Sequence, residues 1–340
     1  MLNIISDFIK GILPSKKKTT PSGWTSFNGV CCPYNGESAD TRGRGGLTAN
    51  PDGSVSYHCF NCNFKASYQP GRHLTFKFRK LLKWLGADDT DIKRLVIEAI
   101  RVRELVAPEE VKTEAEEERI EFKVRDLPED AISIRQLQTA KITDILPGLL
   151  SSAIDYVKSR RIDLTKYDIL WTDSTEHSLH QRVIIPCIWQ GRTIGYTSRA
   201  FVDGVKPKYY SHYEPNFVFN INNQLADSKF VIVCEGPFDA MSIDGVAVLN
   251  NECNETQADI IESLGREVIV VADRDRAGAK MIANAIEYGW TVSFPVWLET
   301  CKDVNEAVIK YGKLFVLKSI LDAKQTSKLK IELMRKKLYN

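Results

Sequence analysis

Short apolar runs alternate with segments of helical periodicity in the part of the chain that follows residue 222. Buried strands are predicted at 230–234, 246–249, 267–272 and 292–297, and helices are predicted to begin at 239 and to cover 255–264 and 278–288. This alternation is typical of a parallel sheet that is covered by helices on both faces. The C-terminal part is therefore expected to be an α/β domain.

A second pattern precedes it, in a globular region that begins near Ala131. Residues 182–189 and 193–200 form two apolar runs, joined by the turn-forming sequence Gln190-Gly191-Arg192, and this predicts a β-hairpin. Residues 151–162 have the spacing of a helix with a basic end. The region is expected to be a mixed α+β subdomain.

The N-terminal third differs in composition and in its pattern of hydrophobic residues. Residues 24–71 are rich in Gly, Cys, Asn and aromatic residues, which predicts a small module of loops and hairpins. Its core is too small to be stable without a cross-link such as a bound metal ion. Helical periodicity follows between Leu74 and Ile100. Residues 1–14 are expected to form a short amphipathic helix, a candidate for partner docking or for local packing, and 16–22 a flexible link. The acidic segment up to Asp130 is expected to be an exposed linker or a solvated helix.

Overall composition is that of an ordinary globular protein, and its charge is unevenly distributed. The chain has 340 residues, 43% of them hydrophobic, and a formal net charge of +2. Residues 72–103 carry nine Lys and Arg against four acids, residues 109–130 ten acids against four bases, and residues 324–340 six bases against one acid. Basic blocks that flank an acidic one indicate a polyanionic partner. The apolar N-terminal stretch is too short to cross a bilayer, so no membrane association is expected.

Four of the eight cysteines occur in two close pairs, Cys31/Cys32 and Cys59/Cys62, and the other four are scattered. This pattern favours a reducing, cytoplasmic location and one structural Zn²⁺ site rather than a disulfide framework. Adjacent cysteines are an awkward pair of ligands, so one of Cys31 and Cys32 is a possible spectator, with His58 or His73 as the fourth ligand.

Aromatic and basic residues are interleaved in the same module. Aromatic rings stack on unpaired bases and Arg or Lys follow phosphates, which is how single strands are held. The competing interpretation is that the rings form the small core of the module, and we expect this of roughly half of them. The residues concerned are Trp24, Phe27, Tyr57, Phe60, Phe64, Tyr68, Arg42, Arg44, Lys65 and Arg72.

Carboxylates follow two of the predicted parallel strands. Glu235 and Asp239 belong to the sequence VIVCEGPFD, and Asp273 and Asp275 to VIVVADRDRAG. Because the carboxyl ends of parallel strands meet at one edge of a sheet, these acids are expected to converge and to bind Mg²⁺ or Mn²⁺. Asp303 follows the last strand and is expected to complete the site, whereas Asp239 alone is also explained as a helix cap. A P-loop sequence is absent, which excludes a fused P-loop ATPase.

With its Glu-Gly-x-x-Asp and Asp-x-Asp motifs, the segment from Phe230 to about Asp322 resembles the Toprim domain. The chain as a whole resembles DnaG-type DNA primases of bacteria and tailed phages. The resemblance extends upstream to Arg182-Val-Ile-Ile-Pro, Arg199 and Lys206-Pro-Lys-Tyr209 of the basic subdomain, and to the cysteine module, which lies where the family has its zinc-binding domain. Departures are the Cys-Cys half-site, Asn305 in place of a second Asp, Tyr210-Ser211 in place of Leu-Asn, and Ile221 in place of Lys.

The resemblance implies roles for individual residues. Glu235 is expected in acid/base chemistry or as a ligand, and the acids Asp239, Asp273, Asp275 and Asp303 in holding Mg²⁺. Arg199, Lys208 and Arg276 are expected to contact NTP or template. Arg182 is expected to hold the template backbone, or else to be a charge at the edge of the sheet.

The function expected from this resemblance is synthesis of RNA primers from NTPs on single-stranded DNA, beside a separate replicative helicase in a bacterial or phage-infected cell. The alternatives are a Toprim-family nuclease and a non-catalytic factor that binds single-stranded DNA. The expected divisions are an N-terminal helix and link (1–22), a zinc ribbon (23–72), a helical segment with acidic linker (73–130), a basic subdomain (131–226), a Toprim domain (227–322) and a basic tail (323–340).

Overall fold

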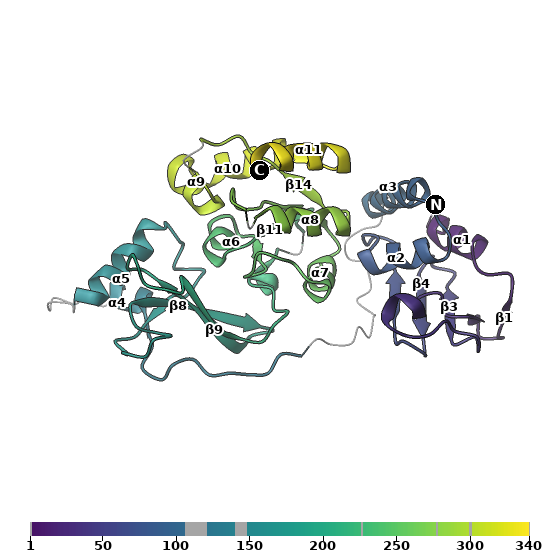
Figure 1. Ribbon diagram of the computed structural model, residues 1–340, viewed down its shortest axis with the longest axis horizontal. Helices are drawn as coiled ribbons and strands as arrows, with labels where there is room; N and C mark the ends of the chain where they lie inside the picture. Colours follow the sequence, from purple (N-terminus) through teal and green to yellow (C-terminus); the bar gives the residue numbers. More distant parts are fainter. Residues whose placement is uncertain are drawn as a thin grey trace. The chain divides into compact units, whose positions relative to one another are not determined.

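The computed structural model describes residues 2–105, 121–139, 148–225, 227–276, 278–298 and 301–339. The chain divides into two compact units (Figure 1). The first consists of Met1–Glu117 with Glu262–Arg266, and the second of Glu118–Ile261 with Glu267–Asn340. In the described part of the chain, no helix has both the length and the apolar character needed to cross a membrane.

The first unit is built on an antiparallel sheet with the strand order β1-β2-β3-β4-β5. Its strands are β1 (Lys17–Thr19), β2 (Thr25–Phe27), β3 (Gly45–Ala49), β4 (Val55–Cys59) and β5 (Lys65–Tyr68), and its helices are α1 (Ile4–Gly11), α2 (Phe76–Trp84), α3 (Asp89–Leu105) and the 3₁₀ helix η1 (Cys32–Asn35). The buried residues Phe27, Tyr57 and Tyr68 form part of the core, whereas Phe60 is 63% exposed. As expected, some of the aromatic residues of this module are in its core, and others are at its surface.

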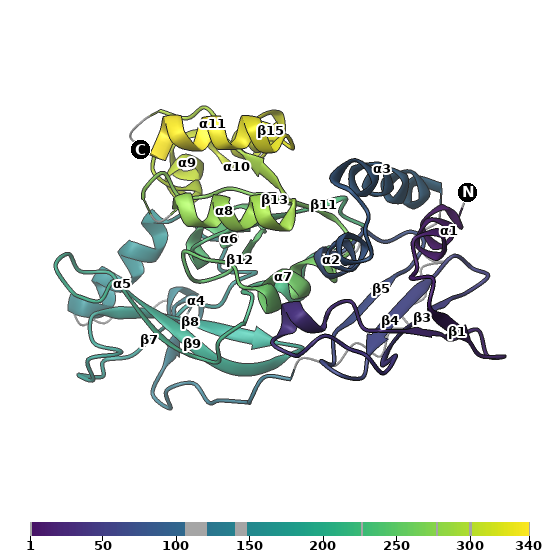
Figure 2. The same ribbon diagram turned by 45° about the vertical axis from the view of Figure 1, so that its right-hand side comes forward.

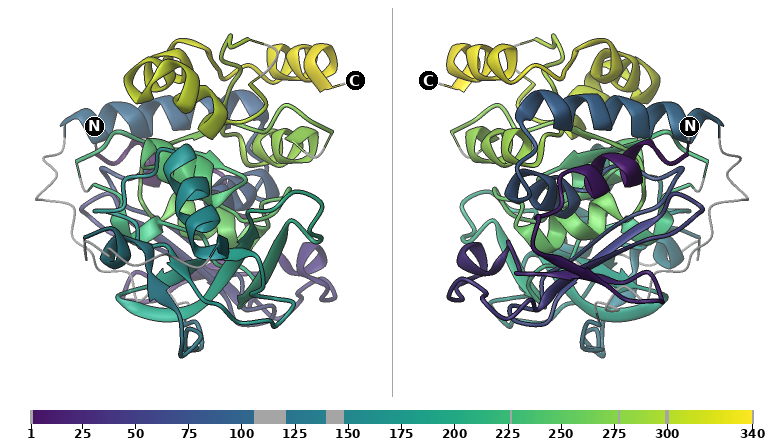
Figure 3. Two further views of the ribbon diagram at one scale, coloured as in Figure 1. Left: turned by 90° about the vertical axis from the view of Figure 1, so that its left-hand side faces the viewer. Right: turned by 90° about the vertical axis from the view of Figure 1, so that its right-hand side faces the viewer.

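At the N-terminus, the helix has the expected local packing, and the expectation of a flexible link is corrected. The apolar face of α1 is not available to a partner, because Ile5 and Ile9 are buried in the core of the first unit and α1 lies beside α3 (Figure 3). Residues 17–19, expected as part of a flexible link, pair with β2 as an edge strand. Thr19 and Thr25 share a side-chain hydrogen bond across this pair, so the threonines favour the strand.

The second unit contains two sheets, and the first of them is antiparallel with the order β10-β9-β8-β7-β6. Its strands are β6 (Ile132–Ser133), β7 (Leu170–Trp171), β8 (Arg182–Trp189), β9 (Arg192–Ala200) and β10 (Tyr209–Tyr213), and it is accompanied by α4 (Ile134–Thr139), α5 (Gly148–Ser159) and the 3₁₀ helix η3 (Ile221–Asn223). The predicted hairpin is present as β8 and β9. Gln190 and Gly191 have φ values of 48° and 77°, as a tight hairpin turn requires.

Residues 121–130 are not an exposed linker. Arg125 forms a β-bridge with Ile194, and the Phe122 ring lies 5.0 Å from that of Trp189. Phe122 and Leu127 of this segment pack against the core, which a count of charges does not reveal. Residues 106–120, the rest of the predicted linker, lie outside the described residues.

The second sheet has the order β12-β11-β13-β14-β15, with four parallel strands and β15 antiparallel at one edge. The strands are β11 (Phe230–Cys234), β12 (Val246–Ala247), β13 (Glu267–Val270), β14 (Thr291–Ser293) and β15 (Lys324–Gln325), and the helices are α6 (Pro237–Ile243), α7 (Glu255–Glu262), α8 (Gly278–Tyr288), α9 (Val304–Tyr311), α10 (Lys313–Asp322) and α11 (Lys328–Tyr339). Helices α6, α9 and α10 pack together, and α8 packs against α11 (Figure 2). The predicted fold class, a multidomain α/β protein with an N-terminal β module, is confirmed.

The expectation that residues 323–340 form a separate basic tail is also corrected. β15 pairs with β14, and Ile331 of α11 is 2% exposed. Lys324 forms an ion pair with Glu267 of β13 at 2.9 Å. Residues 324–339 are therefore part of this α/β sheet and its helical cover rather than a free appendage.

Candidate active site and cysteine cluster

Four of the five predicted acids of the α/β sheet come together at the carboxyl ends of its central strands, and Asp275 does not join them. Glu235 directly follows β11, and Asp273 lies three residues beyond β13, which is the neighbouring parallel strand. Asp239 is in the first turn of α6, and Asp303 is the N-cap of α9. All four carboxylates line one cavity of about 200 Å³. The parallel topology thus produces the convergence that the sequence predicted.

Backbone N–H groups hold one oxygen of three of these carboxylates. Asp273 N–H donates to Glu235 Oε1 at 3.0 Å, Asn305 N–H to Asp239 Oδ1 at 2.9 Å, and Glu306 N–H to Asp303 Oδ1 at 2.7 Å. Within the described part of the chain, no donor is bonded to the second oxygen of these three groups or to the carboxylate of Asp273. Oxygen atoms therefore remain for a hard cation.

The electrostatics of the cluster also favour a cation. Burial, and then the charges of neighbouring acids, raise the pKa of Asp273 to about 8. Burial raises the pKa of Glu235 to about 7, against the opposing hydrogen bond from Asp273 N–H. The pKa values of Asp239 and Asp303 are also raised, in both cases first by burial. Like charges this close stay ionised together only when a positive charge neutralises them.

Gly236 is required at the turn between Glu235 and α6. A Cβ atom at this position would lie 2.7 Å from Asp239 Oδ2, closer than real contacts allow. Any larger residue would therefore push the Asp239 carboxylate away from its place in the cavity.

Cationic side chains from the antiparallel sheet form the opposite wall. Arg199 of β9 and Lys208, which precedes β10, both line the cavity. The Arg199 guanidinium lies 4.6 Å from the ring centroid of Tyr209, the residue it faces across the β9–β10 pair. Arg199 is only 8% exposed, and its Nε has no hydrogen-bond partner among the described residues. A buried donor of this kind is suited to an anionic ligand.

Arg160 is a cavity residue that the sequence reasoning did not single out. Its Nη1 donates to Asn305 Oδ1 at 3.0 Å, and its guanidinium lies over the rings of Tyr156 and Phe238. The only signal in the sequence was the basic end of the helix predicted at 151–162. Nothing in that pattern shows that the end of α5 reaches the acids.

Three predicted site residues lie elsewhere. Arg182 is fully buried, and its guanidinium donates to the backbone carbonyls of His177, Pro207 and Lys208, so the prediction of a template contact or an edge charge is wrong. Asp275 and Arg276 are exposed and are not among the residues that line the cavity. Asp275 Oδ1 instead accepts a hydrogen bond from Gly278 N–H at the start of α8, although its charge still raises the pKa of Glu235.

The four predicted cysteine ligands lie together in the first unit. The Sγ atoms of Cys31, Cys32, Cys59 and Cys62 are all within 4.8 Å of one another, with 3.3 Å between Cys31 and Cys62 and 3.5 Å between Cys32 and Cys59. Four sulfurs at about 2.3 Å from one ion, as in tetrahedral zinc sites, are spaced in this range. The adjacent pair Cys31-Cys32 thus contributes both of its thiols to the cluster.

Histidine is not needed to complete this cluster. His73 forms a hydrogen bond with Arg103 at 2.7 Å, and the His58 ring packs against Phe60 at 4.2 Å. Burial raises the pKa of Cys32 to about 11, whereas backbone N–H groups of Cys62 and Asn61 outweigh burial at Cys59 and lower its pKa. Buried thiols of this kind become thiolates on binding a metal.

Comparisons with known proteins show similarity in the part of the chain that holds the acids. Residues 232–308 match the family model described as Toprim-like. A DNA primase of Aquifex aeolicus (strain VF5) is 26% identical over 152 residues, which are 39% of this chain and 30% of that protein. The chain therefore spans less than a third of the length of this curated relative.

Among solved structures, the Aquifex aeolicus primase with its zinc-binding and RNA polymerase domains has a TM-score of 0.45 at 20% identity, over 94% of this chain and 83% of that one. A DnaG catalytic core has a TM-score of 0.44 at 18% identity, over 56% of this chain and 78% of that one. Residues 232–308 of this chain thus match the Toprim-like family, and part of the chain is similar in sequence to a DNA primase.

Proposed function

We propose that the chain is a DNA primase, which synthesises short RNA primers on single-stranded DNA. The observation that carries the proposal is the composition of the cavity in the second unit. Four carboxylates from the Toprim-like domain share this cavity with Arg160, Arg199 and Lys208. A metal-binding wall opposite a cationic wall is suited to a nucleoside triphosphate, because its phosphates need both metal ions and basic side chains.

The residues of each wall have separate tasks in this proposal. Arg199 and Lys208 hold the triphosphate, and Arg160 adds positive charge near Asn305. Asp273, Asp239 and Asp303 hold Mg²⁺ or Mn²⁺, which when bound stabilises the charge on the attacking and leaving oxygens. Asp275 is retained as a ligand at the outer edge of the cluster, and Arg276 as a contact to template.

The reaction is a nucleotidyl transfer. The 3′-hydroxyl of the primer, or of the first nucleotide, forms a bond to the α-phosphorus of the incoming NTP while the bond to pyrophosphate breaks. In this proposal Glu235, whose pKa is raised to about 7 and whose Oε1 accepts a hydrogen bond from Asp273 N–H, accepts the proton of that hydroxyl.

The first unit supplies the second part of the proposal. We infer that the four cysteines hold one structural Zn²⁺. Phe60, in the Cys59–Cys62 turn, is 63% exposed, with Trp24 at 6.1 Å and the backbone of Arg44 bonded to its N–H. An exposed ring beside a basic residue is suited to an unpaired base, so this surface is proposed to read the template.

Several finer predictions belong to the same proposal. They are the boundary between the basic subdomain and the Toprim domain near residue 226, a separate replicative helicase as partner, and action in the cytoplasm of a bacterial or phage-infected cell.

Incorporation of labelled NTPs on single-stranded DNA without a supplied primer tests the function. The wild-type chain with Mg²⁺ or Mn²⁺ is expected to make short RNA, and the Asp273→Asn variant to make at least about 100-fold less. The variant Asp322→Asn, which changes an exposed acid of α10, is the matched control. Degradation of the template would indicate a nuclease instead, and template binding without synthesis or cleavage would indicate a non-catalytic factor.

A further inference from the structure

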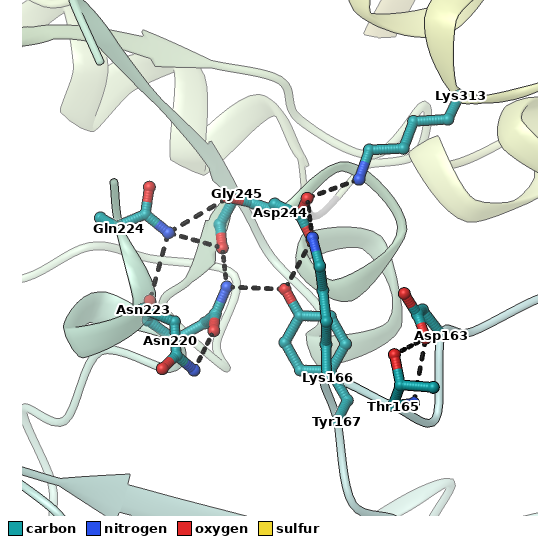
Figure 4. Close-up of polar contacts among 10 residues, drawn as sticks. All are labelled: Asp163, Thr165, Lys166, Tyr167, Asn220, Asn223, Gln224, Asp244, Gly245 and Lys313. Atoms are coloured by element: carbon teal, nitrogen blue, oxygen red, sulfur yellow. Dashed lines mark hydrogen bonds and ion pairs between the residues drawn. The ribbon is translucent and has the colours of Figure 1, made fainter. Parts of the chain in front are cut away.

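A group of polar side chains surrounds Asp244 (Figure 4). Asp244 caps the C-terminal end of α6, whereas Asp239 lies in the first turn of this helix. Asp244 Oδ2 accepts from Lys313 Nζ at 2.6 Å and from Lys166 Nζ at 2.9 Å. Asp244 Oδ1 accepts from the Tyr167 hydroxyl at 2.9 Å. One carboxylate thus binds three donors from two distant parts of the chain. We call this group the Asp244 cluster.

A second layer of hydrogen bonds extends the cluster into the backbone. Asn220 Nδ2 donates to the Tyr167 hydroxyl at 3.1 Å and to the Gly245 carbonyl at 2.7 Å. Gln224 Nε2 donates to the carbonyls of Asp244 and Gly245 at 3.1 and 3.3 Å (Figure 4). Asn220 is 6% exposed, so this layer is largely shielded from water.

The cluster joins the two walls of the active-site cavity. Lys166 and Tyr167 lie in the segment between α5 and β7, which belongs to the antiparallel sheet that supplies Arg199. Asp244 ends α6 and Lys313 begins α10, both of which belong to the Toprim-like domain. Residues 220–224 precede β11 and connect the two. The Asp244 cluster is therefore a direct polar connection between the cationic wall and the acidic wall.

Helix α6 transmits the position of the cluster to the site. It has only seven residues, all of them buried, and it begins at the Gly236 turn and carries Asp239 in its first turn. Helix α6 packs against α9, which Asp303 caps, so the two acids keep their relative positions when the cluster is lost, and only their spacing from the cationic wall changes.

We propose that Asp244 is a positioning residue, which fixes the spacing between the acidic wall and the phosphate-binding wall of the cavity. The proposal rests on the proposed function, because it assigns the cavity to a metal-bound NTP. An NTP must contact both walls at once, whereas a metal ion alone needs only the acids of the Toprim-like domain. Loss of the cluster is therefore expected to weaken NTP binding and to leave metal binding intact.

The backbone at Asp244 makes a clean substitution possible. Asp244 has a φ of 55°, in the left-handed region that Asn tolerates better than most residues. Asp244→Asn therefore removes the charge that binds the two lysines without straining the end of α6. Lys313→Met removes one partner from a surface position, and serves if Asp244→Asn does not fold.

The control is Lys318→Met, on the same helix as Lys313. Lys318 is also paired with an aspartate, Asp322, but that pair is exposed and lies within α10. Each of the two substitutions therefore removes one positive charge and one ion pair, but only Lys313→Met removes a contact of the Asp244 cluster.

The experiment measures Mn²⁺ affinity by electron paramagnetic resonance and the affinity for a non-hydrolysable, fluorescent ATP analogue in the presence of Mn²⁺. Asp244→Asn and Lys313→Met are expected to weaken analogue binding at least about threefold, and to change Mn²⁺ affinity less than twofold. The KM for NTP should rise in parallel, with a smaller change in kcat. Lys318→Met should match wild type in all of these.

Unchanged analogue affinity in both cluster variants would overturn the positioning role, as would an equal loss of Mn²⁺ and analogue binding. A wild-type chain that binds the analogue but makes no RNA would contradict the proposed function and leave the positioning result standing. A wild-type chain that binds neither Mn²⁺ nor the analogue would overturn both.

Discussion

The backbone N–H of Asn305 donates a hydrogen bond to Oδ1 of Asp239, and the Asn305 side chain bonds to the backbone that follows α5. Its Nδ2 donates to the Arg160 carbonyl at 2.9 Å and to Ser242 Oγ at 2.7 Å, and Asn305 is 1% exposed. The amide that stands where bacterial primases are expected to have an Asp therefore has a structural task, because a carboxylate cannot donate these bonds.

Asn305→Asp is predicted to destabilise the chain by about 2 kcal/mol at pH 8, since it loses two buried donors and adds a charge beside Asp239. The loss should shrink toward pH 5, where the new acid is protonated. Thermal denaturation at both pH values measures it. Asn222→Asp, at an exposed position whose amide donates to the Ile188 carbonyl at 3.3 Å, should change stability by less than about 0.5 kcal/mol. Equal effects at the two positions would contradict the assigned role.

Asp273→Asn is predicted to stabilise the metal-free chain while abolishing synthesis. The folded-state pKa of Asp273, about 8, is above its ordinary value of 3.8. The folded chain therefore holds more protons than the unfolded chain between these values, and wild-type stability falls as pH rises through this window. Neutral Asn removes this cost, so the midpoint of unfolding at pH 8 without metal should rise by the equivalent of about 1 kcal/mol or more.

Added Mg²⁺ provides the second half of that test. It should raise the midpoint of the wild type, because a ligand that binds only the folded state stabilises it, and should do so much less for Asp273→Asn. A variant that is no more stable than wild type without metal, and that responds to Mg²⁺ equally, would remove Asp273 from the metal site.

Sequence patterns predicted the features that depend on residues close together in the chain or on the regular geometry of a sheet. The β8–β9 hairpin followed from two apolar runs and a Gln190-Gly191 turn, and the meeting of Glu235 with Asp273 followed from the geometry of parallel strands. The burial of Arg182 did not follow. Its position at the head of an apolar strand gives no indication that three carbonyls from the His177 and Pro207 segments surround it.

Side chains that act across elements were also missed. Arg160 reaches the cavity only because α5 packs against α6 and α9, and the Asp244 cluster depends on three segments that are far apart in sequence. In residues 121–130, a high charge concealed the inward-facing Phe122 and Leu127. Such contacts depend on tertiary packing, which a single sequence does not reveal through periodicity or charge.

Cys31→Ser and Cys32→Ser are both predicted to lose most of the bound zinc, because the structure places both thiols in the cluster. The wild type should contain about one equivalent by metal analysis. Cys301→Ala, which changes a buried cysteine of the second unit, should keep it. Full zinc content in either Ser variant would identify that cysteine as a spectator.

Residues 121–130 are predicted to contribute to the stability of the second unit. A truncated chain that starts at Ala131 should be less stable than one that starts at Glu121, because the missing segment is packed. Phe122 contacts Trp189 and Phe217, with ring centroids 5.0 and 5.9 Å apart, and Arg125 N–H donates to the Thr193 carbonyl at 3.1 Å. Loss of one half-buried aromatic side chain and of this hydrogen bond should cost about 2–4 kcal/mol.

Thermal denaturation of the two truncated chains measures the difference, which should be several degrees in the midpoint. Phe122→Ala in the longer chain should reproduce part of the loss. Val124→Ala, at a neighbouring position that is 53% exposed, should not. Equal midpoints for the Glu121 and Ala131 chains would mean that the segment contributes nothing to the fold. In that case the catalytic unit would begin at Ala131, as its sequence predicted, and the acidic segment would act as a linker along its whole length.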